Sequence, residues 1–383
     1  MLFTPEHEEL RRTTRRIIEK QINPFIDAWE ASGIFPAHEV FKTLGDAGLL
    51  GIDKPVEYGG LGLDYSYEIA FAEELGHIKA AGVATAIGVQ IDMCTPALAR
   101  HGSDALRRDW LAPSIAGDIV GCIGVSETGA GSDVASLKTF ARKDGADYVI
   151  TGSKMWITNG TQADWMCMLA NTSSDGGPYK NKSLIVVPMD SKGITVARKL
   201  DKLGLRSSDT AQLFFDEVRV PQSNRIGEEN RGFIYQMEQF QQERLFSAAK
   251  MIAFLEDVIE DTLEYTHQRQ AFGRTILDNQ AVQFKLAEMQ TELECLRALV
   301  HSAAERYVAG EDVTRLASMA KLKAGRLGMQ VPTECLQFWG GQGYMSESQV
   351  SRAYRDARIS AIAGGANEIM LQIISKLMIK ELG

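Results

Sequence analysis

The hydrophobic periodicity of the chain changes twice, and these changes constrain the fold more than any other feature. In the first part, apolar residues such as Leu10, Ile17 and Ile18 recur at helical spacing. Short segments bounded by Gly, Asp, Asn and Ser follow, as is typical of strands, and then long stretches of helical period return. The pattern predicts an α+β multidomain protein with an N-terminal helical domain, a middle β-domain of short strands and a C-terminal helical bundle, over residues 1–117, 118–226 and 227–383.

The individual elements can also be placed. Thr4, Pro5 and Glu6 resemble an N-cap, a proline at the first helical position and an acidic first turn, so a helix is expected to begin here. Further helices are predicted near residues 37–48, 66–80, 104–116, 231–266, 278–308, 312–338 and 367–382. Strands are predicted at 119–125, 147–151, 165–170, 183–188 and 211–215.

Composition excludes several classes of protein. Lys and Arg number 41 against 50 Asp and Glu, and a net charge of −9 argues against nucleic acid as the main partner. No window holds the roughly twenty apolar residues that a membrane span needs. Five widely spaced cysteines predict neither a disulfide framework nor a metal site, which favours a reducing compartment. We expect a bacterial cytoplasmic protein, with the mitochondrial matrix as the alternative because a processed organellar protein fits the same sequence.

Two motifs lie in the β-domain. The loop GVSETGAGSD, from Gly124 to Asp133, can bring backbone N–H groups close to an anion, although an ordinary turn explains it equally. In KMWITNG, strand alternation puts Trp156 and Thr158 on one face and Ile157 on the other. An aromatic ring beside a hydroxyl suits a flat heteroaromatic ligand, and a tryptophan in a sheet core is the alternative.

Three motifs follow in the C-terminal region. In RQAFG, Arg269 can hold phosphate or can simply favour the end of a helix. The segment QFWGGQG, which begins at Gln337, fits a helix end followed by a tight loop. Gly364 and Gly365 precede a helix whose first N–H groups favour a negative or carbonyl oxygen, and a plain turn is again the alternative.

Glu243 is the candidate base. On a long helix its neighbours are Phe240, Phe246 and Ser247, and a carboxylate between two phenyl rings is partly desolvated. Desolvation raises the pKa of a carboxyl group toward neutral pH, as general-base catalysis requires. The alternative is a solvated glutamate paired with Arg244.

Together and in this order, the motifs resemble the acyl-CoA dehydrogenases. The resemblance spans the whole chain, with family signatures at residues 124–136 and 337–356. It implies a C-terminal four-helix bundle, one FAD per subunit and a homotetramer. It also implies two sets of contacts. The flavin set comprises Val125, Ser126, Ser132, Trp156 and Thr158, and the set reaching a neighbouring subunit's FAD or closing over it comprises Arg269, Phe272, Gln280, Gln337, Gly341 and Ala366 to Glu368.

The resemblance further implies α,β-desaturation of an acyl-CoA thioester, with Ser132, Arg244, Gly364 and Gly365 at the substrate. The N–H group of Gly364 would then donate to the thioester oxygen. Many family members carry the catalytic glutamate where this chain has Gly364, which cannot act as a base. Long-chain and isovaleryl-type members instead place it in a Glu-Arg-Leu context on the long helix. Residues 243–245 match that context, so Glu243 is the expected base.

The presence of glycine at position 364, where many family members carry the catalytic glutamate, also indicates the kind of substrate. Since Gly364 leaves space beside the reacting carbons, we expect a branched, terpenoid (citronellyl-like) or medium-to-long acyl chain. An electron-transferring flavoprotein is the expected acceptor. Two other functions fit parts of the sequence: an acyl-CoA oxidase that uses O2, although such oxidases are usually longer, and a non-catalytic acyl-CoA or flavin-binding protein, against which Glu243 counts.

Overall fold

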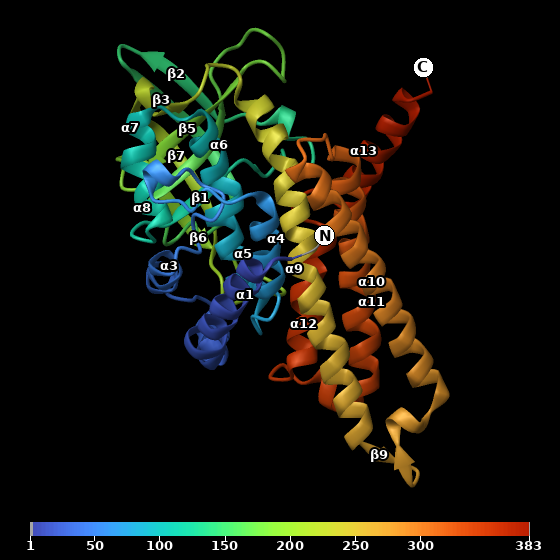
Figure 1. The fold of residues 1–383 in the computed structure, drawn as a ribbon. Helices are drawn as coiled ribbons and strands as arrows, with labels where there is room; N and C mark the ends of the chain where they lie inside the picture. Colours follow the sequence, from blue (N-terminus) through green and yellow to red (C-terminus); the bar gives the residue numbers. More distant parts are fainter. Residues whose placement is uncertain (1–2, 383) are drawn as a thin grey trace.

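A computed structural model describes residues 3–382, and its three regions follow the order expected from the sequence (Figure 1). The first α-helix begins at Pro5, and the N–H group of Thr4 donates to His7 Nδ1 at 3.1 Å. The N-terminal α-helices are α1 (Pro5–Ile17), α2 (Ile26–Ser32), α3 (Ala37–Asp46), α4 (Tyr65–Leu75), α5 (Ala81–Gly88), α6 (Thr95–His101), α7 (Asp104–Leu106) and α8 (Ala112–Ile115). Three π-helical turns interrupt them, η1 (Ile18–Ile22), η4 (Val89–Cys94) and η5 (Arg107–Leu111).

The middle region is an eight-stranded sheet in the order β6-β7-β3-β2-β4-β5-β8, with β1 parallel to β4. Alternate residues of β4 enter two apolar clusters, one with Trp165 and Cys167 and the other with Met166 and Met168. Both faces of the sheet are therefore covered. The strands are β1 (Gly121–Gly124), β2 (Phe140–Asp144), β3 (Asp147–Thr158), β4 (Trp165–Asn171), β5 (Lys182–Pro188), β6 (Ile194–Lys199), β7 (Thr210–Pro221) and β8 (Arg225–Ile226).

The C-terminal region is a bundle built around a 37-residue helix, α9 (Gly232–Gln268). The start of α9 is seated on β5, where a Cβ atom added at Gly232 would meet the backbone of Ser183 and Leu184. The other α-helices are α10 (Gln280–Val308), α11 (Thr314–Trp339), α12 (Gln349–Ala357) and α13 (Asn367–Lys380), and β9 (Gln270–Ala271) and β10 (Arg274–Thr275) form a hairpin after α9. The structure confirms the predicted fold class.

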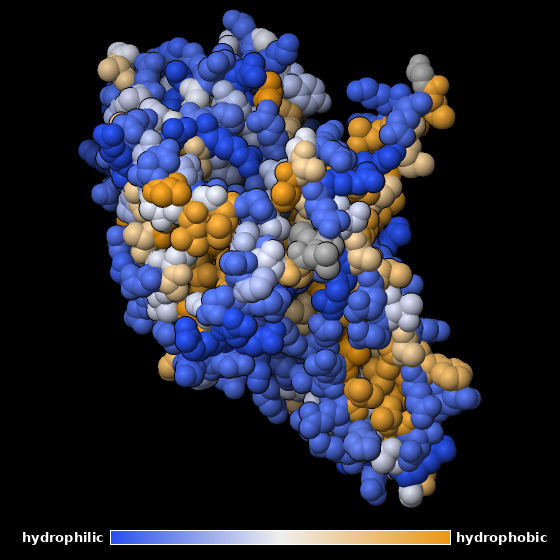
Figure 2. Space-filling model, in the orientation of Figure 1, coloured by the Kyte–Doolittle hydropathy of each residue, from blue (hydrophilic) through white to orange (hydrophobic). Residues whose placement is uncertain are grey.

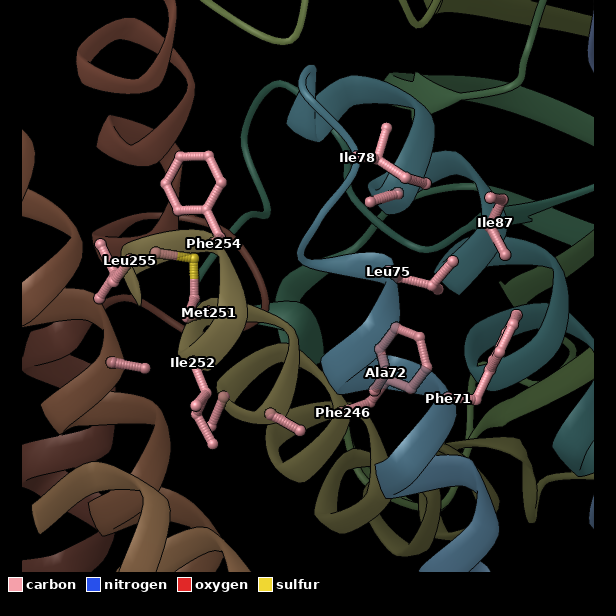
Figure 3. Packing of buried hydrophobic residues seen from close by; sticks show 14 of the residues in the cluster. Phe71, Ala72, Leu75, Ile78, Ile87, Phe246, Met251, Ile252, Phe254 and Leu255 are labelled. Atoms are coloured by element: carbon pink, nitrogen blue, oxygen red, sulfur yellow. The ribbon is translucent and has the colours of Figure 1, made fainter. Parts of the chain in front are cut away.

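Helix α9 also joins the bundle to the N-terminal region. Figure 3 shows Phe71 and Ala72 of α4 and Phe246 of α9 at their shared boundary, and all three belong to one buried cluster. A Cβ atom at Gly88 would lie 2.7 Å from the Phe246 ring, so α5 can approach α9 only because this residue is glycine. This packing fixes the part of α9 that carries Glu243.

Several elements were not expected from the sequence, each for a physical reason. The run from Ala81 to His101 is buried on nearly all sides, so it lacks the polar stripe that marks an amphipathic helix. It is the one described helix long and apolar enough to cross a membrane by composition, yet 83% of its most apolar window is buried inside the protein. Strand β6 has no buried residue and therefore no alternation of apolar side chains.

Candidate active site

Glu243 is the twelfth residue of α9 and lies where the helix passes the N-terminal region, and its side chain is buried with 6% exposure. Its Oε1 atom accepts hydrogen bonds from Gln239 Nε2 at 2.7 Å and from Gln236 Nε2 at 3.2 Å. Both described hydrogen bonds reach Oε1, so the carboxylate is held by one oxygen while Oε2 is left for a ligand. Burial raises the pKa of Glu243 to about 7 despite these donors.

The surroundings of Glu243 differ in detail from those expected. Phe246 points into the core beside α5. Arg244 lies over the face of the Phe240 ring, with its Cζ atom 5.6 Å from the ring centroid. Arg244 is buried and donates to Ser318 Oγ at 3.5 Å, so the alternative of a solvated glutamate and arginine pair is wrong. The two glutamines were not singled out from the sequence. Their spacing of four and seven residues before Glu243, on one helical face, is the signal that could have found them.

The Gly364–Gly365 loop approaches the same face of α9. Both glycines have positive φ, +65° and +96°, which residues that carry a side chain rarely adopt. Lys321 of α11 holds the loop, because its Nζ atom donates to the carbonyl oxygens of Ser360 at 2.6 Å and Gly365 at 3.3 Å. Burial lowers the pKa of Lys321 to about 8. A Cβ atom at Gly364 would lie 3.9 Å from Ser247 Oγ, one turn after Glu243, so the loop and the candidate base share one site.

The structure brings the β-domain motifs together. The N–H group of Met155 donates to the Ser126 carbonyl at 3.0 Å, which joins the loop after β1 to β3. A register shift in β3 turns Trp156 outward at φ +61°, with 52% exposure, while Ile157 is buried. The alternative of a core tryptophan is therefore wrong for Trp156. Thr158, at the end of β3, is half-buried.

A buried lysine supports this loop. Lys154 is fully buried and donates to Val125 O at 3.0 Å, Leu169 O at 2.8 Å and Glu127 Oε1 at 3.1 Å. Glu127 also accepts from the N–H groups of Lys138 and Thr139, which closes the loop at its far end. Ser132 is exposed at the tip between them. The sequence did not single out Lys154 as the support of this loop.

The second set of expected contacts lies elsewhere on the chain. Arg269 follows the last residue of α9, 26 positions after Glu243, which is about 40 Å along a helix. Phe272 is fully exposed in the β9–β10 hairpin at the far end of the bundle (Figure 1). Gln280 begins α10, and Gln337 and Gly341 flank the end of α11, all exposed. One chain therefore does not bring these five residues to the flavin set. Ala366 is the N-cap of α13 and Glu368 is in its first turn.

The residues of the first set fit a flavin. A ring system needs an apolar face and polar atoms at its edge, and Trp156 offers the face while the 125–126 segment and Thr158 offer the edge. A Cβ atom at Gly129 or Gly131 would meet nothing within 4 Å, so the loop leaves room for a phosphate-bearing ligand. The exposed Arg269 supplies a cation suited to a phosphate bound by another copy.

Comparisons with known proteins match all three regions of the chain to one family. The chain matches the N-terminal, middle and C-terminal domains of acyl-CoA dehydrogenases over residues 4–118, 122–218 and 230–379. It is 38% identical to the mitochondrial long-chain specific acyl-CoA dehydrogenase of Sus scrofa over 382 residues, covering 99% of this chain and 88% of that protein. It is 35% identical to the mitochondrial isovaleryl-CoA dehydrogenase of Oryza sativa subsp. japonica, covering 100% and 93%.

The fold agrees as well. The crystal structure of an acyl-CoA dehydrogenase from Geobacillus kaustophilus has a TM-score of 0.95 and 38% identity, covering 98% of both chains. The chain therefore belongs to the acyl-CoA dehydrogenases, oxidoreductases that use FAD.

Proposed function

We propose that this chain removes one proton and one hydride from neighbouring carbons of an acyl-CoA thioester, with Glu243 as the base. The observation that carries the proposal is the state of Glu243: a buried carboxyl group with a pKa of about 7, anchored through Oε1 alone. A base with a pKa near the working pH is the most effective one for abstracting a weakly acidic proton. Its position on α9, facing the Gly364 loop, agrees with the Glu-Arg-Leu branch of the family.

Different residues of the chain take part in proton removal, in binding the thioester and in holding the flavin. Glu243 takes the α-proton, and the N–H group of Gly364 donates to the thioester oxygen as negative charge develops there. Bound FAD supplies the acceptor for the β-hydride, so that the acyl group leaves as the trans-2-enoyl thioester. Val125, Ser126, Trp156 and Thr158 would hold the flavin, with Ser132 between its phosphate and the substrate. Arg244 and Gly365 complete the substrate side of the site.

The second set of contacts belongs, in this proposal, to a neighbouring subunit's FAD. Arg269, Gln280, Gln337 and Gly341 lie at the far end of the bundle, whereas Ala366 and Glu368 directly follow the Gly364–Gly365 loop. Large apolar side chains are exposed at the far end, including Phe272, Phe284 and Tyr344. Figure 2 shows apolar surface gathered on the lower part of the bundle. A homotetramer would cover this surface and bring Arg269, Gln280, Gln337, Gly341, Ala366 and Glu368 to their places.

The proposed substrate is a branched, terpenoid (citronellyl-like) or medium-to-long acyl-CoA. Gly364 supports this choice because the position where many relatives carry a carboxylate here bears no side chain. A methyl branch near the reacting carbons can use that space. The proposed acceptor is an electron-transferring flavoprotein, and the proposed location is the bacterial cytoplasm. Flavin reoxidation in air, with and without that flavoprotein, separates the dehydrogenase from an oxidase.

The decisive experiment is anaerobic bleaching of the yellow holoenzyme by a panel of straight and methyl-branched acyl-CoAs. We expect bleaching by the wild type and by Glu260→Gln, an exposed control on α9, and none by Glu243→Gln with FAD still bound. Bleaching of Glu243→Gln at the wild-type rate would overturn the assignment of the base. A preference for butyryl-CoA over every longer or branched chain would overturn the substrate.

A further inference from the structure

The nitrogen and the oxygen of the Gln239 side-chain amide are both hydrogen-bonded, and their partners come from two regions of the chain. The residue is buried on α9 with 1% exposure. Its Nε2 atom donates to the Met93 carbonyl at 2.5 Å and to Glu243 Oε1 at 2.7 Å, and its Oε1 atom accepts from the N–H group of Ala97 at 3.2 Å. All three contacts are direct hydrogen bonds.

These partners leave one orientation for the amide. The N–H group of Ala97 can only donate and the carbonyl of Met93 can only accept, so Gln239 must present its oxygen to Ala97 and its NH2 group to Met93. The second hydrogen of that NH2 group then points at Glu243. Met93 and Ala97 are four residues apart, which is the spacing of an α-helical hydrogen bond. The amide therefore bridges two backbone groups that an undisturbed helix would pair with each other, where the π-helical turn η4 meets α6.

We propose that Gln239 is a positioning residue for the reaction: the η4–α6 backbone fixes its amide, and the amide holds Glu243 in the carboxylate form with Oε2 turned to the substrate. This inference rests on the proposed role of Glu243 as the base. Gln236 contributes less, because its bond to Glu243 is longer and its own Oε1 atom, although buried, has no partner among the described residues. The N-terminal region thus sets the state of a base that belongs to the bundle.

The charged and titratable groups around Glu243 do not replace the Gln239 amide as the group that holds the carboxylate. The titratable groups that interact with the carboxylate are Arg244 beside it on α9, Asp92 of η4 and Cys167 of β4. Burial raises the pKa of Asp92 and of the Cys167 thiol above their ordinary values, so burial favours the neutral form of each. Arg244 stabilises the carboxylate from a distance, whereas Gln239 makes the shortest described contact with it.

The test is the pH profile of kcat/KM for holoenzyme carrying Gln239→Leu, which removes the donor at similar volume. Because the hydrogen bond favours the charged form, its loss should move the acid limb upward by about one pH unit. At about pH 6 the kcat/KM of the variant should then be roughly tenfold below that of the wild type, and at about pH 9 the two values should converge. Gln239→Glu, which places a second carboxyl beside Glu243, should move the limb further in the same direction.

The matched control is Gln241→Leu, on the same helix, whose Oε1 atom accepts, within residues 3–382, from the N–H group of Val313 at 3.2 Å and does not contact Glu243. Its acid limb should coincide with that of the wild type. An unshifted limb in both Gln239 variants, measured per bound FAD, would overturn the positioning role while leaving Glu243 as the base. Activity in Glu243→Gln would instead overturn the proposed function itself, so the two failures are distinguishable.

Discussion

Gly364 faces Ser247 across the candidate site: a Cβ atom at Gly364 would lie 3.9 Å from Ser247 Oγ, one turn of α9 beyond Glu243. It would also lie 3.5 Å from Lys321 Cε. Both are ordinary van der Waals distances, so a methyl group fits the site but occupies the space that we assign to a branched substrate. The glycine is thus a determinant of the shape of the site as well as of its backbone.

Replacing Gly364 by Ala should therefore narrow substrate choice. We expect the ratio of kcat/KM for a methyl-branched over a straight acyl-CoA to fall about tenfold, since one methyl group in a pocket has that effect. The positive φ adds roughly 1 kcal/mol of strain. Gly310→Ala is the control, because Gly310 has φ +82° and open space around it, so it carries the strain without touching the site. An unchanged ratio would show that Gly364 does not border the acyl chain.

The raised pKa of Glu243 also predicts a pH-dependent stability difference. A carboxyl group whose pKa rises from 4.5 to about 7 on folding binds a proton more tightly in the folded state. The folded protein therefore loses stability as the pH rises through that window. Glu243→Gln should be more stable than the wild type by on the order of 3 kcal/mol above about pH 7, with the difference vanishing near pH 4.5. Urea unfolding at both pH values measures this, with Glu260→Gln expected to match the wild type at each.

Much of the fold could be predicted from periodicity, while the support of the site could not. The residues that we propose to face the ligand are of recognisable types, such as Trp156 in its motif or Glu243 in Glu-Arg-Leu. Lys154 is recognisable only once the structure shows what it contacts, whereas helical spacing relates Gln239 to Glu243 but not to the backbone groups that fix its amide. Lys154 lies on a strand, where a charged residue usually indicates a solvent-exposed position. Gln239 forms hydrogen bonds with Met93 and Ala97, which are more than 140 positions away in the sequence. No local pattern encodes such partners.

Lys154 should be required for FAD binding through the loop it supports. Lys154→Met leaves the Val125 carbonyl and the Glu127 carboxylate without their buried donor. Loss of one partner of a buried ion pair destabilises a protein by about 3 kcal/mol or more. We expect the FAD-to-protein ratio to fall together with the free energy of unfolding. Lys143→Met, which removes the exposed pair with Glu229, should keep both values. Full FAD content in Lys154→Met would contradict this role.

Lys321 should matter for the position of the Gly364 loop rather than for flavin. Without its bonds to Ser360 and Gly365, the loop can shift, and small displacements in an active site reduce rates by up to about 100-fold. We therefore expect Lys321→Met to lower kcat about 10- to 100-fold with normal FAD absorbance. Lys323→Met, on the same helix, breaks the pair with Glu292, away from the Gly364 loop, and should retain wild-type kcat. An equal loss in both variants would point to general damage of α11.

Phe272 tests the assembly that the second set of contacts requires. Its side chain is fully exposed at the tip of the hairpin, held at φ +54°, where a monomer gains nothing from an aromatic ring. If the ring is buried against another subunit, its removal forfeits on the order of 3 kcal/mol of interface energy. Phe272→Ala should dissociate at higher protein concentration in sedimentation equilibrium and release FAD as it does so. Phe214→Ala, at an exposed position on β7, should sediment like the wild type. A wild-type protein that sediments as a monomer with FAD bound would contradict the neighbouring-subunit contacts altogether.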